Sequence, residues 1–117
     1  MAFKVIDNPD FKKFKDHTGF KNHEFKKLAG LYRLGASAKA LHDMAVDVDF
    51  EEKTCMVTYY QSNMHIPSLQ FIVKQVGPRT IMYELFKHEK GRIAKSELFD
   101  RVFQRLEQEI MDIIEEN

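Results

Sequence analysis

The sequence is poor in cysteine and has no long apolar run. Its one cysteine, Cys55, cannot form a disulfide within the chain, and such thiols are typical of reducing compartments. No apolar segment is long enough to predict a membrane-spanning helix. The opening MAFKVIDNPDF is too short and too polar for a signal peptide. These absences predict a cytoplasmic protein without a membrane anchor.

Net charge is also absent, because 18 Lys and Arg residues balance 18 Asp and Glu residues. This balance argues against a general binder of polyanions. The distribution is uneven, however. Residues 1–33 hold eight Lys and Arg against four acids, and residues 97–117 hold two against seven. We expect helices at the two ends of the chain to lie side by side, or to meet across a dimer.

Motifs that would fix a reaction are missing. The chain has no glycine-rich phosphate loop and no arrangement of Ser, His and Asp that suggests a nucleophile. Its histidines do not pair with one another or with Cys55 at metal-ligand spacing. The sequence therefore predicts no catalytic residues, metal site or cofactor, and favours a protein that is not an enzyme. The histidines are His17, His23, His42, His65 and His88.

Helical patterns lie at both ends of what the length predicts to be a single domain, residues 1–117. A short helix is predicted over 7–19, where Asn8 and Pro9 suit its start. A second is predicted over 22–44, with an end near Gly35 as an alternative, because glycine weakens a helix interior. A long amphipathic helix is predicted after Ser96, which can cap it.

Between these helices the apolar period changes to two, which is typical of strands. Four strands are predicted, over 46–50, 55–61, 69–76 and 80–86, and a further short strand over 3–6 is left open. A turn at Glu52–Lys53 would pair Phe50 with Cys55, and a loop at Val76–Pro78 would pair Val73 with Ile81. We therefore expect an α+β fold with two N-terminal helices, a four-stranded antiparallel meander and a long C-terminal helix packed on the sheet, in the order α-α-β-β-β-β-α.

The stretch MAVDVDFEE, Met44–Glu52, places several carboxylates close together. Asp47 and Asp49 would share one face of a strand, about 7 Å apart by strand rise. The stretch lacks the glycine and the spacing of a calcium-binding loop. Charged side chains also deter pairing between the edges of two sheets. We expect Asp47 and Asp49 to lie exposed on an edge strand, without a third ligand.

The second face of the predicted sheet is too apolar to be fully hydrated. An exposed patch of this kind usually marks an interface, and methionine and tyrosine suit such surfaces. Cover by the N-terminal helices is the alternative. The sequence favours a non-enzymatic protein-interaction domain that forms a homodimer or binds another protein. The predicted interface residues are Met56, Tyr60, Ile72, Met82 and Phe86.

Two other functions are left open. The first is a binder of, or enzyme on, a small apolar ligand, since a meander followed by a long helix is also the layout of folds that enclose a cavity. Its candidate ligand-binding residues are Tyr59, His65 and Tyr83, with Phe71 and Phe103 along the cavity wall. The second is nucleic-acid binding through the lysine- and phenylalanine-rich N-terminal helices. Its candidate residues are Lys12, Lys13 and Lys15, although the neutral net charge disfavours it.

Overall fold

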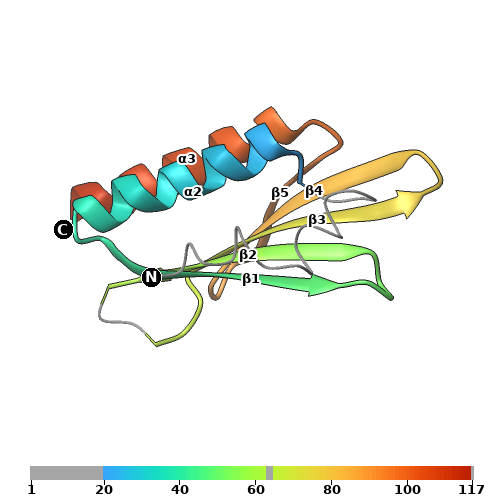
Figure 1. Ribbon diagram of the computed structural model, residues 1–117. Coiled ribbons are helices and arrows are strands. Elements are labelled where there is room, and N and C mark those ends of the chain that lie inside the picture. Colours follow the sequence, from blue (N-terminus) through green and yellow to red (C-terminus); the bar gives the residue numbers. More distant parts are fainter. Residues whose placement is uncertain (1–19, 63–64, 117) are drawn as a thin grey trace.

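A five-stranded antiparallel sheet carries two helices on one of its faces (Figure 1). The computed structural model describes residues 20–62 and 65–116. Strand order in the sheet follows chain order, β1-β2-β3-β4-β5, so each strand is joined to its neighbour by a hairpin connection. The elements are α2 (Asn22–Ser37), β1 (Leu41–Asp49), β2 (Thr54–Gln61), β3 (Leu69–Gly77), β4 (Thr80–Lys87), β5 (Gly91–Ser96) and α3 (Phe99–Glu116).

The expected fold class is wrong in its strand count, since the described order is α-β-β-β-β-β-α. The missed strand is β5, whose GRIAKS sequence has one strong strand former, Ile93, among glycine, small and basic residues. Its pairing with β4 overrides this weak local preference. One predicted helix, 7–19, and the optional strand over 3–6 lie outside the described residues.

Two further boundaries differ from the prediction. The second helix ends at Ser37, close to the alternative end near Gly35 and not near residue 44, and β1 begins at Leu41 rather than at residue 46. Lys39, with φ of 61°, turns the chain between them. At the other end of the chain Ser96 closes β5, and its hydroxyl accepts a hydrogen bond from the Leu98 amide at 3.0 Å. Leu98 precedes α3, which begins at Phe99, so the prediction that Ser96 caps this helix is wrong, and Ser96 belongs to a strand.

Both predicted hairpin registers are shifted by two residues. Val48, not Phe50, pairs with Cys55, because four residues, 50–53, turn the chain and Lys53 adopts a φ of 52°. Tyr83, not Ile81, pairs with Val73, because the chain turns between Gly77 and Thr80 and a bulge between Gln75 and Gly77 then sets the register. Side chains alternate along a strand, so a shift of two keeps each side chain on its predicted face.

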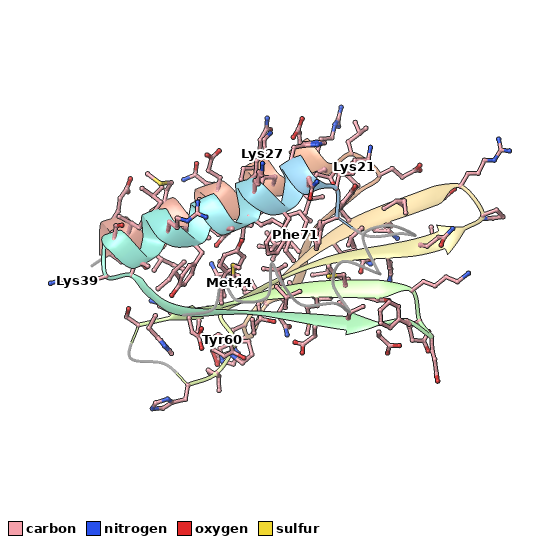
Figure 2. All side chains as sticks on the ribbon, viewed as in Figure 1. Lys21, Lys27, Lys39, Met44, Tyr60 and Phe71 are labelled. Carbon is pink, nitrogen blue, oxygen red and sulfur yellow. The ribbon has the colours of Figure 1, made fainter. Side chains whose placement is uncertain are left out.

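The core lies between the helices and the inner face of the sheet. Figure 2 shows Phe71 and Met44 in this layer, and both side chains are buried. Phe20, Phe71, Tyr83 and Phe99 pack as one aromatic cluster, with ring centroids 5.5 to 6.4 Å apart. Such tilted and edge-to-face pairs add to the free energy gained from burial alone.

The helices α2 and α3 lie side by side, as the opposite charges of the chain ends predict (Figure 1). The Lys27 ammonium meets the Asp100 carboxylate at 3.3 Å and lies 5.7 Å from the Phe103 ring centre. Both partners of this ion pair are exposed, so its contribution to stability is small. None of the described helices is long and apolar enough to cross a lipid bilayer.

The two glycines inside α2 predict opposite effects of substitution by alanine. A Cβ at Gly30 would meet no atom within 4 Å, so Gly30→Ala should raise the free energy of unfolding by about 1 kcal/mol through helix propensity. A Cβ at Gly35 would lie 2.5 Å from Cδ1 of Leu41, which is buried. The steric clash in Gly35→Ala should exceed the same gain in helix propensity. The free energy of unfolding should therefore fall by about 1 kcal/mol.

Urea denaturation of the two variants beside the wild type measures this difference. Each variant is the other's control, because both replace a glycine of the same helix with the same residue. Equal stability changes in the two variants would contradict the close approach of Gly35 to Leu41.

Candidate functional site

The sheet face that turns away from the helices carries half-buried apolar side chains, and none of the described helices lies over it. Both described helices pack on the inner face, and within 20–62 and 65–116 no element lies over the outer one (Figure 1). Figure 2 shows Tyr60 on this outer side, opposite to Phe71. A sheet face that no described element covers meets water, a partner or other residues of the same chain. Of the two N-terminal helices predicted as alternative cover, α2 packs on the inner face, and the helix predicted over 7–19 lies outside the described residues.

An apolar patch occupies the centre of the outer face. Ile72 on the middle strand pairs directly with Met56 on β2. On the other side it pairs with Glu84 of β4, and Met82 and Phe86 flank Glu84 on the same strand. The structure thus brings together four of the five predicted interface residues, each half-buried. We call Met56, Ile72, Met82 and Phe86 the outer patch.

Tyr60, the fifth predicted residue, lies at the margin of the outer face rather than in the patch. It pairs with Asp43 of β1, and its ring centre lies 6.0 Å from that of His42. Tyr60 is half-buried like the residues of the patch. The hydroxyl of tyrosine suits such a half-hydrated position at the rim of an apolar surface.

A buried carboxylate lies within this patch. The Glu84 side chain is only 3% exposed, although glutamate is almost never buried unless it is paired. Lys74 Nζ meets Glu84 Oε1 at 3.2 Å, and Arg92 Nη1 donates to Glu84 Oε2 at 3.2 Å. Both cations are partly exposed. The ion cluster lets an acidic residue sit among apolar neighbours without an unpaired buried charge.

Charge is sorted across the outer face from one edge strand to the other. The strand β1 carries the acidic margin, which we define as Asp43, Asp47 and Asp49. The opposite edge strand, β5, carries the basic margin, Arg92 and Lys95. Sequence reasoning missed the basic margin because it missed β5, and a search for short basic edge strands is the signal that finds it.

A hollow of about 780 Å³ opens on this face beside the β1–β2 hairpin. Met56, Ile72 and Thr54 line it from the sheet. Acidic side chains surround it, and the Asp49 carboxylate also accepts a hydrogen bond from the Glu52 amide at 3.1 Å. The hollow therefore combines an apolar floor with a negative rim. Its acidic residues are Asp47, Asp49, Glu51 and Glu52.

The carboxylates of this rim are spread along the exposed end of the β1–β2 hairpin. Asp47 and Asp49 are exposed on an edge strand, where the sequence places them. In the part of the chain that the structure describes, no group of three or more His, Cys, Asp or Glu residues could hold a metal ion. Divalent cations prefer several oxygen ligands that converge on one point.

The residues of the predicted ligand cavity do not converge on an open space. Tyr59 is fully buried and its hydroxyl donates to the Leu28 carbonyl at 2.8 Å. The Tyr83 hydroxyl contacts both carboxylate oxygens of buried Glu24, at 2.9 and 3.1 Å. His65 is exposed on the loop after β2. Burial raises the pKa of both tyrosines, so both hydroxyls stay protonated at neutral pH.

The other candidate residues divide between the core and the part of the chain that is not described. Phe71 is fully buried in the aromatic cluster, and Phe103 stacks on Phe99 with centroids 5.3 Å apart. The predicted nucleic-acid residues Lys12, Lys13 and Lys15 lie outside the described residues. The outer face is therefore the surface on which the described geometry gathers the predicted residues.

Searches against models of protein families, curated proteins and solved structures find no match to this chain. The function must therefore be argued from the arrangement of its own residues.

Proposed function

We propose that this chain is a small protein-interaction domain, without enzymatic activity of its own, that self-associates through the outer face of its sheet. The observation that carries the proposal is the outer patch on a face to which no described element packs. Apolar surface that is removed from water contributes about 25 cal/mol per Å². Methionine and aromatic residues also recur at interface centres.

The ligand-binding alternative has weaker support. A binding cavity needs an open volume with a few polar groups directed into it. The hydroxyls of Tyr59 and Tyr83 are bound to Leu28 and Glu24, and the ring of Phe71 has no exposed surface.

The cytoplasmic location that the single thiol favours stays a prediction.

Met82→Glu is expected to convert a dimer of this 13.8 kDa chain to a monomer. Burial of an unpaired carboxylate at an interface costs several kcal/mol, which corresponds to a loss of affinity of about 100-fold or more. Analytical ultracentrifugation over a concentration series gives the mass directly. Circular dichroism of the variant checks that it remains folded.

Met111→Glu is the matched control. Met111 is an exposed methionine of α3, on the helical side of the molecule. The same substitution there should leave the dimer intact. A wild-type chain that sediments as a monomer at every concentration, or a Met82→Glu variant with the wild-type mass, would remove the proposal.

A further inference from the structure

One row of side chains crosses all five strands on the outer face. Successive register partners in this row are Asp47, Met56, Ile72, Glu84 and Lys95. Glu84 is neutralised within its own ion cluster. The row therefore has a negative end on β1, an apolar middle and a positive end on β5. This order determines how two copies of the face can meet, so the inference that follows rests on the proposed function.

Two copies that meet through the same face are related by a two-fold axis lying between them. An axis perpendicular to the strands would place β1 over β1 of the second copy, and hence Asp47 over Asp47. An axis parallel to the strands, above β3, places β1 over β5 of the second copy. Asp47 then faces Lys95 at both ends of the row. Only the second arrangement pairs opposite charges.

The same axis fills the acidic hollow. In the neighbouring row Thr54 and Met82 are both register partners of Lys74, one on each side of the middle strand. Rotation about an axis above β3 exchanges these two positions, so Met82 of the second copy lies over Thr54. Thr54 is part of the hollow. The order of charges along the row and the position of the hollow are separate observations. Both favour the axis parallel to the strands.

We propose that two copies of this chain pack sheet to sheet about a two-fold axis parallel to β3, with Met82 of each copy seated in the acidic hollow of the other and Asp47 of each opposite Lys95 of the other. Facing sheets pack about 10 Å apart, a gap that an aspartate and a lysine can span together. Lys74 lies near the axis, but its ammonium is held by Glu84 of its own copy at 3.2 Å.

The size of the face is sufficient for this dimer. Five strands spaced by ~4.8 Å and about eight residues long cover roughly 24 by 27 Å. That is roughly 650 Å², in the lower part of the range of about 600–1,000 Å² per partner that a stable interface of ordinary size buries. The charged margins lie at its two long edges, so they remain hydrated while the outer patch is buried.

The first test compares two charges at one position. Met82→Glu would place a carboxylate among Asp47, Asp49, Glu51 and Glu52 of the second copy, whereas Met82→Lys would place an ammonium there. Dimer dissociation constants from ultracentrifugation should rise about 100-fold or more for Met82→Glu and less than about 10-fold for Met82→Lys. Equal weakening by the two substitutions would overturn this orientation and leave the proposed function standing.

The second test exchanges the charges of the row. Asp47→Lys and Lys95→Asp should each weaken the dimer about 10-fold at low salt, because each creates two like-charge contacts across the axis. An equimolar mixture of the two variants should restore wild-type affinity, since each mixed dimer regains opposite charges at both ends. An axis perpendicular to the strands predicts no weakening by either single variant, and that result would overturn the inference. A monomeric wild-type chain would instead refute the proposed function itself.

Discussion

Replacing both Lys74 and Arg92 with methionine is expected to lower the free energy of unfolding by about 3 kcal/mol. Both cations hold the carboxylate of Glu84, which is 3% exposed. Their loss would leave a buried charge without a partner, and breaking a buried ion pair in this way costs about 3–5 kcal/mol. The lower end applies, because both cations are themselves partly exposed. Methionine keeps the apolar stems, so the change reports mainly on charge.

Chemical denaturation at one fixed protein concentration measures this loss. Adding Glu84→Gln to the double variant should restore most of the stability, because the uncompensated charge is then gone. Lys90→Met, on the exposed turn between β4 and β5, is the control for loss of a lysine and should change stability by less than about 0.5 kcal/mol. A loss below about 1 kcal/mol in the double variant would mean that Glu84 is hydrated in solution.

The folded protein is expected to lose stability steeply between pH 9 and pH 12 because of Cys55. Burial, with a smaller contribution from the Asp47 carboxylate, raises the pKa of this thiol from 9.0 to about 12. The thiol therefore ionises in the unfolded chain at a lower pH than in the folded chain. Its contribution to stability is complete below pH 9 and is lost as the pH rises toward 12. The slope approaches about 1.4 kcal/mol per pH unit.

Urea denaturation from pH 8 to pH 10.5, with a reductant present, compares the wild type with Cys55→Ala. The variant loses some packing at every pH, but its stability should decline less steeply above pH 9. The buried tyrosines have raised pKa values in both proteins, so their contribution cancels in the comparison. Parallel pH profiles would show that the thiol does not control alkaline unfolding.

The outer patch could be predicted from the sequence because a strand has only two faces. The period of two assigns Met56 and Ile72 to the face opposite Cys55, and a register error of two residues does not alter that assignment. The turns themselves could not be predicted as well. Lys53 and Lys39 adopt positive φ. Lysine rarely has this backbone conformation, so the residue type does not predict it.

The charge pairing across the face could not be predicted, because it depends on β5. GRIAKS has little strand preference of its own and forms a strand by pairing with β4. Without that strand, Arg92 and Lys95 have no assigned face. The sequence alone therefore does not predict the basic margin that lies opposite the acidic margin.

Buried carboxylates were missed for a different reason. Glu24 and Glu109 lie on helices at positions that a hydrophobic stripe does not include, yet both are buried. Glu24 accepts from Tyr83, 59 positions away in the chain, and Glu109 meets Lys87 at 2.8 Å. Burial raises the pKa of Glu109, but hydrogen bonds from Lys87 and Arg105, together with their positive charges, lower it by more. Pairing across long sequence separations decides such burial, and local pattern does not encode it.

The agreement of strand order with chain order also bears on how the molecule forms. Each strand needs only the closure of a short loop to find its neighbour, so the sheet can grow one hairpin at a time at small entropic cost. The two helices differ, since α2 ends at Ser37 and α3 begins at Phe99. Their contact closes residues 38–98, about half of the chain, into one loop. The entropic cost of this closure falls once the sheet has brought the helix ends together. We therefore expect the contact between the two helices to form after the sheet.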